Sequence, residues 1–194
     1  MMTTKQPEED SPNVQIRIGD VEYSIDVTKI PYFNACLRFE QSSGQDSADL
    51  PTYPEMPFFD VINAGVKHGF RRFFRSIPVQ LDDDRFLCKK LYFLCVGVLS
   101  GRNMQSIMRD LRSGKSEWNM DETYRPGGTR NLARDSVFRL LYQFMLGDFK
   151  SDVSDSNMAY NAVLFVASHR EIFKYKTRNM VRAAEEERFD MSEK

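Results

Sequence analysis

The stretch VQIRIGDVEYSID, residues 14–26, contains two short runs in which apolar and polar side chains alternate. Val14, Ile16 and Ile18 carry the apolar positions of the first run, and the same period of two continues beyond Gly19-Asp20. Alternation with a period of two is typical of a strand, and a Gly-Asp pair between two such runs favours a tight turn. This stretch therefore predicts a β-hairpin.

After the hairpin, the spacing of apolar residues changes to that of a helix. Ile30, Phe33 and Leu37 recur at this spacing, which predicts a short helix packed on the hairpin. Three consecutive aspartates, residues 82–84, then precede a strongly apolar run. Carboxylates favour a helix N-terminus through capping and the macrodipole, so we expect a helix over about residues 83–99.

In the second half of the chain, the apolar residues form stripes at helical spacing, and a polar loop separates two of them over residues 113–130. One begins at Met104, and Gly114 is a plausible stop for that helix. The last, an amphipathic stretch, begins near Phe173. The predicted fold class is thus α+β, with a small N-terminal β-hairpin or sheet capped by helices and an all-helical C-terminal half.

Composition limits the classes of function. Of the 194 residues, 27 are Lys or Arg and 28 are Asp or Glu, so the formal net charge is −1 and no global attraction to nucleic acid or anionic membrane is indicated. No stretch approaches the roughly 18 apolar residues that a membrane span needs. The three cysteines, Cys36, Cys88 and Cys95, have no CxxC spacing. We expect reduced, mostly buried thiols in an intracellular protein of the cytoplasm or nucleus.

Residues 14–99 resemble the BTB/POZ domain. The likeness runs through the hairpin and first helix, through ADLPTYPEMPFFDVI (48–62) and through IPVQLDDDRFLCKKLYFLCVGVL (77–99). In place of that family's short aromatic-threonine-glycine corner stands the longer and more basic HGFRRFFRS (68–76). The resemblance covers less than half of the chain.

The resemblance divides the chain into four segments. Residues 1–13 are polar and acidic and are expected to be a disordered tail, followed by the BTB/POZ-like domain at 14–99. A helical extension is expected over 100–189, with a short tail at 190–194. Strings in this extension, such as NAVLFVASH and RAAEEERF, are similar to those of fungal proteins.

BTB/POZ domains dimerise or engage partner proteins, including cullin-type ligase scaffolds and transcriptional regulators. The resemblance therefore implies a non-enzymatic adaptor or regulatory module that acts through protein–protein interaction or oligomerisation, without cofactor or metal. Tyr32 and Phe39 are rings left off the apolar stripe of the first helix, and they are candidate partner-binding residues.

The stretch FRRFFR, residues 70–75, has two readings. Phe70, Phe73 and Phe74 have the spacing of a helix face turned to the core, which leaves Arg71, Arg72 and Arg75 on the opposite side. The favoured interpretation is a packed helix with a solvated basic face, and a protein-binding patch at the three arginines is the next. Exposed rings beside clustered cations would instead suit nucleic acid.

A second basic run extends over residues 170–182 and is followed by the acids Glu185, Glu186 and Glu187. The alternative function is thus a nucleic-acid-associated protein that uses the basic patches 67–75 and 170–182, although nucleic acid is the less favoured partner. An enzyme is not expected. His68 and His169 have no Cys or carboxylate at ligand spacing, and Ser168-His169 lacks the strand–Ser–helix elbow of a hydrolase.

Overall fold

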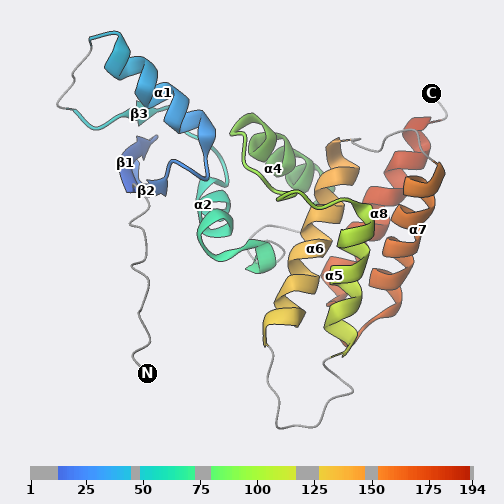
Figure 1. Cartoon of the computed structure of the whole chain (residues 1–194). Helices are drawn as coiled ribbons and strands as arrows, with labels where there is room; N and C mark the ends of the chain where they lie inside the picture. The colour runs from blue at the N-terminus through green and yellow to red at the C-terminus, as the bar shows by residue number, and fades with distance from the viewer. Residues whose placement is uncertain (1–12, 45–48, 73–79, 117–126, 147–152, 193–194) are drawn as a thin grey trace, which may run out of the picture.

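The computed structural model describes residues 13–44, 49–72, 80–116, 127–146 and 153–192, and it has an α+β fold (Figure 1). A three-stranded sheet and two helices form the N-terminal end, and a bundle of longer helices forms the C-terminal half. The predicted fold class is confirmed.

The sheet has the strand order β2-β1-β3. β1 (Asn13–Ile18) pairs antiparallel with β2 (Val21–Asp26), and β3 (Thr52–Tyr53) pairs parallel with β1. Gly19 adopts a φ of +58° in the turn between the first two strands, a conformation that costs glycine little. Ile16 is fully buried, as the alternation predicts.

Two helices cover this sheet and share an aromatic core with it. Phe33 of α1 (Pro31–Ser42) is fully buried. Its ring meets those of Tyr53 and Phe59 edge-on, at centroid distances of 4.8 and 5.8 Å. α2 (Phe59–His68) ends at Gly69, whose φ of +80° turns the chain away from the helix.

The next helix, α4 (Leu81–Phe93), ends earlier than the apolar pattern predicts. The expectation of a helix up to about residue 99 is wrong because Cys95 has a φ of +57°, which breaks the helical path. Beyond the helix, the buried side chains of Leu94, Val96 and Val98 alternate with exposed neighbours. Residues 96–100 are an irregular segment with a tight turn, in which the N–H of Val98 donates to the carbonyl of Val96 at 2.8 Å.

The environments of the three cysteines differ from the expectation of mostly buried thiols. Cys88 is buried within α4, Cys36 is half-buried on α1, and Cys95 is exposed just beyond α4. The expectation is therefore correct for Cys88 and wrong for Cys95. The reason is that α4 ends at Phe93, so Cys95 does not lie on the predicted apolar face of that helix.

Four helices form the C-terminal bundle: α5 (Met104–Ser116), α6 (Gly127–Leu146), α7 (Val153–Ser168) and α8 (Tyr175–Ser192). α6 is the central helix, since every side chain from residue 136 to 144 is buried. None of the helices in the described ranges is both long enough and apolar enough to span a bilayer.

Gly114 lies inside α5 and does not stop it, contrary to the expectation. A Cβ atom at this position would lie only 2.8 Å from the Cβ of Ala133 on α6. The absence of a side chain therefore allows the close approach of these two helices.

A short turn after α2 is one of the contacts between the two halves of the molecule, and α4 also contacts α6 and α8. Phe70 of η1 (Phe70–Arg72) is 9% exposed, and its ring stacks on Phe138 of α6. The prediction that Phe70 belongs to the core is confirmed. Phe73 and Phe74, which were assigned to the same core face, lie outside the described residues.

Candidate binding surfaces

Ser168, His169 and Glu171 are an arrangement that could be mistaken for a catalytic triad. The Ser168 hydroxyl lies 3.1 Å from Nδ1 of His169, and a Glu171 carboxylate oxygen lies 4.0 Å from Nε2. However, Nδ1 is also 2.7 Å from the carbonyl oxygen of Phe165, which can only accept a hydrogen bond, so Nδ1 carries the proton. A protonated Nδ1 cannot activate the serine as a nucleophile. The Ser168 hydroxyl itself donates to the carbonyl of Leu164 at 2.8 Å, so these side chains terminate α7.

Within the part of the chain that the structure describes, no three His, Cys, Asp or Glu side chains are grouped closely enough to hold a metal ion. Two surfaces with other chemistry remain. One is aromatic and lies along α1 and the end of α4, and the other is a basic pocket at the start of α8.

Both of the aromatic residues predicted to bind a partner lie on the outer side of α1. Phe39 is 72% exposed, and Tyr32 is half-buried with its ring centroid 4.7 Å from that of Phe93. Phe39 follows Tyr32 by two helical turns and therefore lies on the same side of the helix. Burial raises the pKa of Tyr32, and the nearby Cys36 raises it further.

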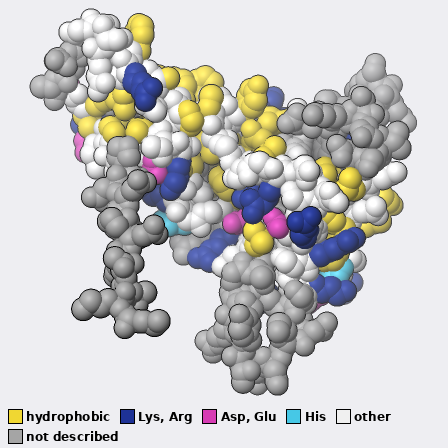
Figure 2. Space-filling view, in the orientation of Figure 1, with side chains coloured by type: hydrophobic (Ala, Val, Ile, Leu, Met, Phe, Trp, Pro, Cys, Tyr) yellow, Lys and Arg dark blue, Asp and Glu magenta, His cyan; other side chains and the backbone are white. Residues whose placement is uncertain are grey.

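The end of α4 extends this row of rings. Tyr92 is 69% exposed and Phe93 is 51% exposed. Together with Tyr32 and Phe39 they form what we call the aromatic surface, and Figure 2 shows hydrophobic side chains gathered over α1 and α4. Tyr92 and Phe93 were not among the residues that the sequence predicts to bind a partner. The available signal was that both rings lie off the apolar stripe of their helix.

A groove of about 530 Å³ adjoins the aromatic surface at Tyr92. One wall is the irregular segment 96–100, and the other contains Tyr142 and Leu146 near the end of α6. The groove exists because α4 ends at Phe93 and the chain then continues past α6 as a non-helical segment. Helical periodicity alone could not indicate it.

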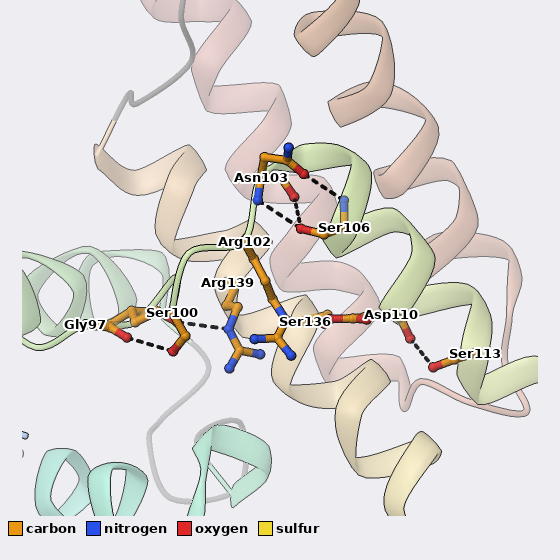
Figure 3. Close-up of polar contacts among 10 residues, drawn as sticks. Gly97, Ser100, Arg102, Asn103, Ser106, Asp110, Ser113, Ser136 and Arg139 are labelled. Atoms are coloured by element: carbon orange, nitrogen blue, oxygen red, sulfur yellow. Dashed lines mark hydrogen bonds and ion pairs between the residues drawn. The ribbon is translucent and has the colours of Figure 1, made fainter.

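A buried arginine holds the wall formed by residues 96–100 in place (Figure 3). The Nε–H of Arg139, on α6, donates to the carbonyl of Val98 at 2.9 Å, and the Arg139 side chain is 9% exposed. Burial lowers the pKa of Arg139 and Arg102 lowers it further, whereas the carboxylates of Asp135 and Asp110 oppose this shift.

The connection from this wall into α5 is also held by side chains. Arg102 pairs with Asp110 at 2.6 Å, and the Ser136 hydroxyl donates to the same carboxylate at 3.4 Å (Figure 3). Asn103 and Ser106 exchange hydrogen bonds between each side chain and the other residue's backbone N–H, at 3.0 and 2.9 Å, in the manner of a capping box. The groove wall is therefore anchored at Val98 and again where α5 begins.

Of the three arginines predicted to form a partner-binding patch, the structure describes the side chain of one. Arg71 is exposed on η1, whereas the side chain of Arg72 and the whole of Arg75 lie outside the described residues. Arg71 lines a pocket of about 270 Å³ together with two lysines of the second basic run, Lys174 and Lys176. The structure thus brings together the two basic runs that are about a hundred residues apart in the sequence.

The complete lining of this basic pocket comes from η1, α6 and the start of α8: Arg71, Arg134, Ile172, Phe173, Lys174, Lys176 and Thr177. Arg134 could not be predicted from the sequence, because nothing in its local pattern distinguishes it from any other arginine on a helix.

Two acids, the half-buried Asp135 and the fully buried Asp84, lie near cations of the basic pocket. Asp135 accepts a hydrogen bond from the backbone of Arg71; burial raises the pKa of Asp135, while Arg139 and Arg71 oppose the rise. Burial also raises the pKa of Asp84 to about 7, with Lys176 opposing that shift. These carboxyl groups therefore partly compensate the positive charge of Arg71 and Lys176.

No protein-family model matches the chain, and neither the curated proteins nor the solved structures contain a match. The geometry of the two surfaces is consequently the basis for assigning a function.

Proposed function

We propose that this chain is a non-enzymatic protein-interaction module, an adaptor or regulatory protein that binds a protein partner through the aromatic surface and the adjoining groove. The observation that carries the proposal is the exposure of Tyr92 and Phe93, at 69% and 51%, directly beside a groove of about 530 Å³.

The energetics of association favour such a surface. Fully burying one large apolar side chain contributes roughly 1.5–3 kcal/mol, and aromatic residues are enriched among those that dominate binding. Rings with only two rotatable side-chain bonds lose little entropy on binding. The hydrogen bond from Arg139 to Val98 holds one wall of the groove before a partner arrives, which reduces the ordering cost further.

The BTB/POZ likeness of residues 14–99 is part of this proposal. It suggests a second copy of the chain or a cullin-type scaffold as the partner, in the cytoplasm or nucleus, where Cys36, Cys88 and Cys95 would stay reduced. Because Tyr142 and Leu146 also line the groove, the proposed binding surface includes a part of the C-terminal half.

Nucleic acid is the alternative partner, and the convergence of Arg71 with Lys174 and Lys176 is the observation in its favour. Nucleic-acid sites are grooves or stripes that follow a phosphate backbone with exposed rings between the cations. The basic pocket is instead a small cavity, and Phe70 of the first basic run is stacked in the core. We therefore prefer a protein partner.

The test compares two tyrosines of equal exposure. Tyr92→Ala removes a ring from the aromatic surface, and Tyr175→Ala removes one that is 71% exposed at the start of α8. Sedimentation velocity over roughly 1–100 μM measures self-association, and affinity capture followed by mass spectrometry measures retention of other partners. Loss of one tyrosine hot spot costs 2 kcal/mol or more, so we expect association to weaken at least about tenfold in Tyr92→Ala only.

The expected readout is either weaker self-association or loss of the same captured protein for Tyr92→Ala, with the Tyr175→Ala variant unchanged. If both variants behave like the parent in both assays, the aromatic surface is not the binding site. Specific, submicromolar binding of nucleic acid at physiological salt would favour the alternative.

A further inference from the structure

A further groove lies on the helical bundle, apart from the aromatic surface and the basic pocket. It follows the line along which α5 and α7 contact each other, and these helices lie side by side (Figure 1). Its volume is about 340 Å³, and its lining comes from both helices: Gln105, Met108, Arg109, Arg112, Met158 and Asn161. The four residues from α5 have the spacing i, i+3, i+4 and i+7, so they form one face of that helix. None of these six described residues is acidic.

Two arginines form the basic side of the groove. Arg109 and Arg112 are exposed, and neither makes a hydrogen bond or an ion pair within the part of the chain that the structure describes. By contrast, Arg102 pairs with Asp110 at 2.6 Å. Two like charges three residues apart lie close together on a helix, so an acidic partner would also reduce their repulsion. Guanidinium groups can hold carboxylates through two parallel hydrogen bonds.

Two methionines form the apolar floor of the groove. Met108 is buried and Met158 is half-buried, so their side chains lie deeper than the exposed arginines. Methionine side chains are flexible and polarisable, and they are common at surfaces that accept apolar side chains of a partner. The floor therefore suits an inserted apolar side chain.

An exposed apolar ridge on α7 borders the groove. Tyr160 is 50% exposed and Leu164 is 47% exposed, and the two lie one helical turn apart. Leu164 follows Asn161, which lines the groove, by three residues and therefore lies on the same side of α7. An apolar ridge beside a basic one is complementary to a segment that has an apolar face and an acidic face.

The length of the groove favours a helical segment. Its α5 side extends from Gln105 to Arg112, which is about 10 Å along the helix axis, or two turns. A helix that lies in such a groove inserts apolar residues spaced by three or four positions. Nucleic acid suits the groove less well, because Met108 and Leu164 provide neither charge nor a ring for base stacking.

We propose that the groove between α5 and α7 binds an acidic amphipathic helix of another protein. Carboxylates of this helix pair with Arg109 and Arg112, and its apolar residues pack on Met108, Met158 and Leu164. The groove is a second docking surface, and it shares no lining residue with the groove of the proposed function.

The test is a fluorescence-anisotropy titration of the full-length chain into labelled probes at about 0.15 M salt. The probe is a peptide of about 18 residues, long enough to form a helix, with Leu on one helical face and Glu and Ala on the other. A comparison peptide has the same composition in an order that spreads Leu around the helix. A single-stranded DNA oligonucleotide is the second comparison.

The groove variant is Arg109→Glu/Arg112→Glu, and Leu164→Ala tests the apolar ridge. The matched control is Lys67→Glu/Lys89→Glu, which changes the net charge by the same amount. Both lysines are exposed, on α2 and α4, and neither lines the groove. Thermal melts without peptide establish that each variant is folded.

We expect saturable binding of one amphipathic peptide per chain with a micromolar Kd. Because Arg109→Glu/Arg112→Glu replaces two attractive charges by repulsive ones, it should weaken binding at least about tenfold. Leu164→Ala should weaken it about threefold or more through lost apolar contact. The lysine control should bind like the parent, and the comparison peptide should bind at least about tenfold more weakly, since its apolar side chains do not share a face.

The absence of saturable binding to the parent would overturn the proposal. Equal affinity for the two peptides, or equal weakening by the two double variants, would show that only general charge is recognised. Tighter binding of the oligonucleotide than of the amphipathic peptide would identify the arginines as a nucleic-acid site instead. The assays of the proposed function depend on Tyr92 and not on Arg109 or Arg112, so the two can fail separately.

Discussion

The ring of Phe70 is stacked on the ring of Phe138, with 4.3 Å between the centroids and 18° between the planes. Phe138 is fully buried at the centre of α6, so this contact joins the N-terminal end of the molecule to the helical bundle. Substituting Phe138 by Ala creates a cavity and removes the support of Phe70. We expect a loss of about 3–5 kcal/mol in the free energy of unfolding, measured by urea denaturation.

Such a loss is a large part of the roughly 5–15 kcal/mol that stabilises a typical domain. The control is Phe39→Ala, because Phe39 is 72% exposed and its removal should change stability by no more than about 0.5 kcal/mol. Equal denaturation midpoints for Phe138→Ala and the parent would contradict the packing described here.

Gly114 supports a second prediction about the contact between α5 and α6. In an unconstrained helix, Gly→Ala stabilises by about 1 kcal/mol. At Gly114, however, the new methyl group would lie 2.8 Å from the Cβ of Ala133, an atom attached directly to the backbone. We expect Gly114→Ala to destabilise the protein by about 1–3 kcal/mol despite its better helix propensity.

The double variant Gly114→Ala/Ala133→Gly removes the clash from the other side. Its stability should exceed the sum of the two single effects by at least about 0.5 kcal/mol, the usual sign of coupling between residues in contact. If the single variant is more stable than the parent, then the two helices do not approach as closely as the structure shows.

The elements that could be predicted from the sequence are those that bury one face locally. The alternation around Ile16 predicts the hairpin, and the stripe through Phe33 predicts the first helix, because the repeat of apolar residues follows directly from backbone geometry. For the same reason the isolated rings of Tyr32 and Phe39 could be identified as surface candidates.

The features that could not be predicted depend on contacts between distant parts of the chain. Val96 and Val98 fit either a helix or a strand, and the irregular segment that contains them is held by the hydrogen bond from Arg139, about forty residues later. Gly114 is a helix stop by its own preference, yet it lies inside α5 because Ala133 occupies the neighbouring space. Neither contact can be identified from the amino-acid sequence alone.

The same limit applies to the candidate sites. The two basic runs are visible in the sequence, but only the fold places Arg71 beside Lys174. Likewise the row of rings continues from Tyr32 to Phe93 because the start of α1 meets the end of α4, where the N–H of Tyr32 donates to the carbonyl of Leu94 at 3.4 Å. The sequence pattern therefore indicates some of the residues of each surface, but it does not show which of them lie together.

The early end of α4 leads to a prediction about cysteine reactivity. Cys95 is exposed beyond the helix, whereas Cys88 is fully buried, and burial raises the pKa of the Cys88 thiol further. Because the thiolate is the reactive form, iodoacetamide should alkylate Cys95 at least about tenfold faster than Cys88 in the native protein. Peptide mass spectrometry at timed intervals measures both rates.

In denaturant the two thiols should react at similar rates, which serves as the internal control. Comparable native rates at Cys88 and Cys95 would place both residues in one environment, as a helix extending to about residue 99 requires.

The last prediction concerns Asp84, which is fully buried in the first turns of α4. Neither of its carboxylate oxygens has a hydrogen-bond partner among the residues that the structure describes. Burial raises the pKa of Asp84 to about 7, Lys176 opposes the rise and Asp83 adds to it. In the unfolded chain the pKa of an aspartate is about 4, so between these values the folded state binds a proton that the unfolded state does not.

The sign of the effect on stability follows from this difference in bound protons. As pH rises from about 4 to about 7, the contribution of Asp84 to the free energy of unfolding falls, and above pH 7 the full cost of the buried charge remains. Three pKa units correspond to about 4 kcal/mol, which is an upper figure. Asp84→Asn removes the titration and should therefore stabilise the protein at pH 8, with a much smaller effect near pH 4. Urea denaturation of both proteins across this range measures the difference, and Asp82→Asn, at an exposed position on the same helix, should follow the pH profile of the parent. If the curves for Asp84→Asn and the parent run parallel from pH 4 to pH 8, the Asp84 carboxyl group is not buried without a partner.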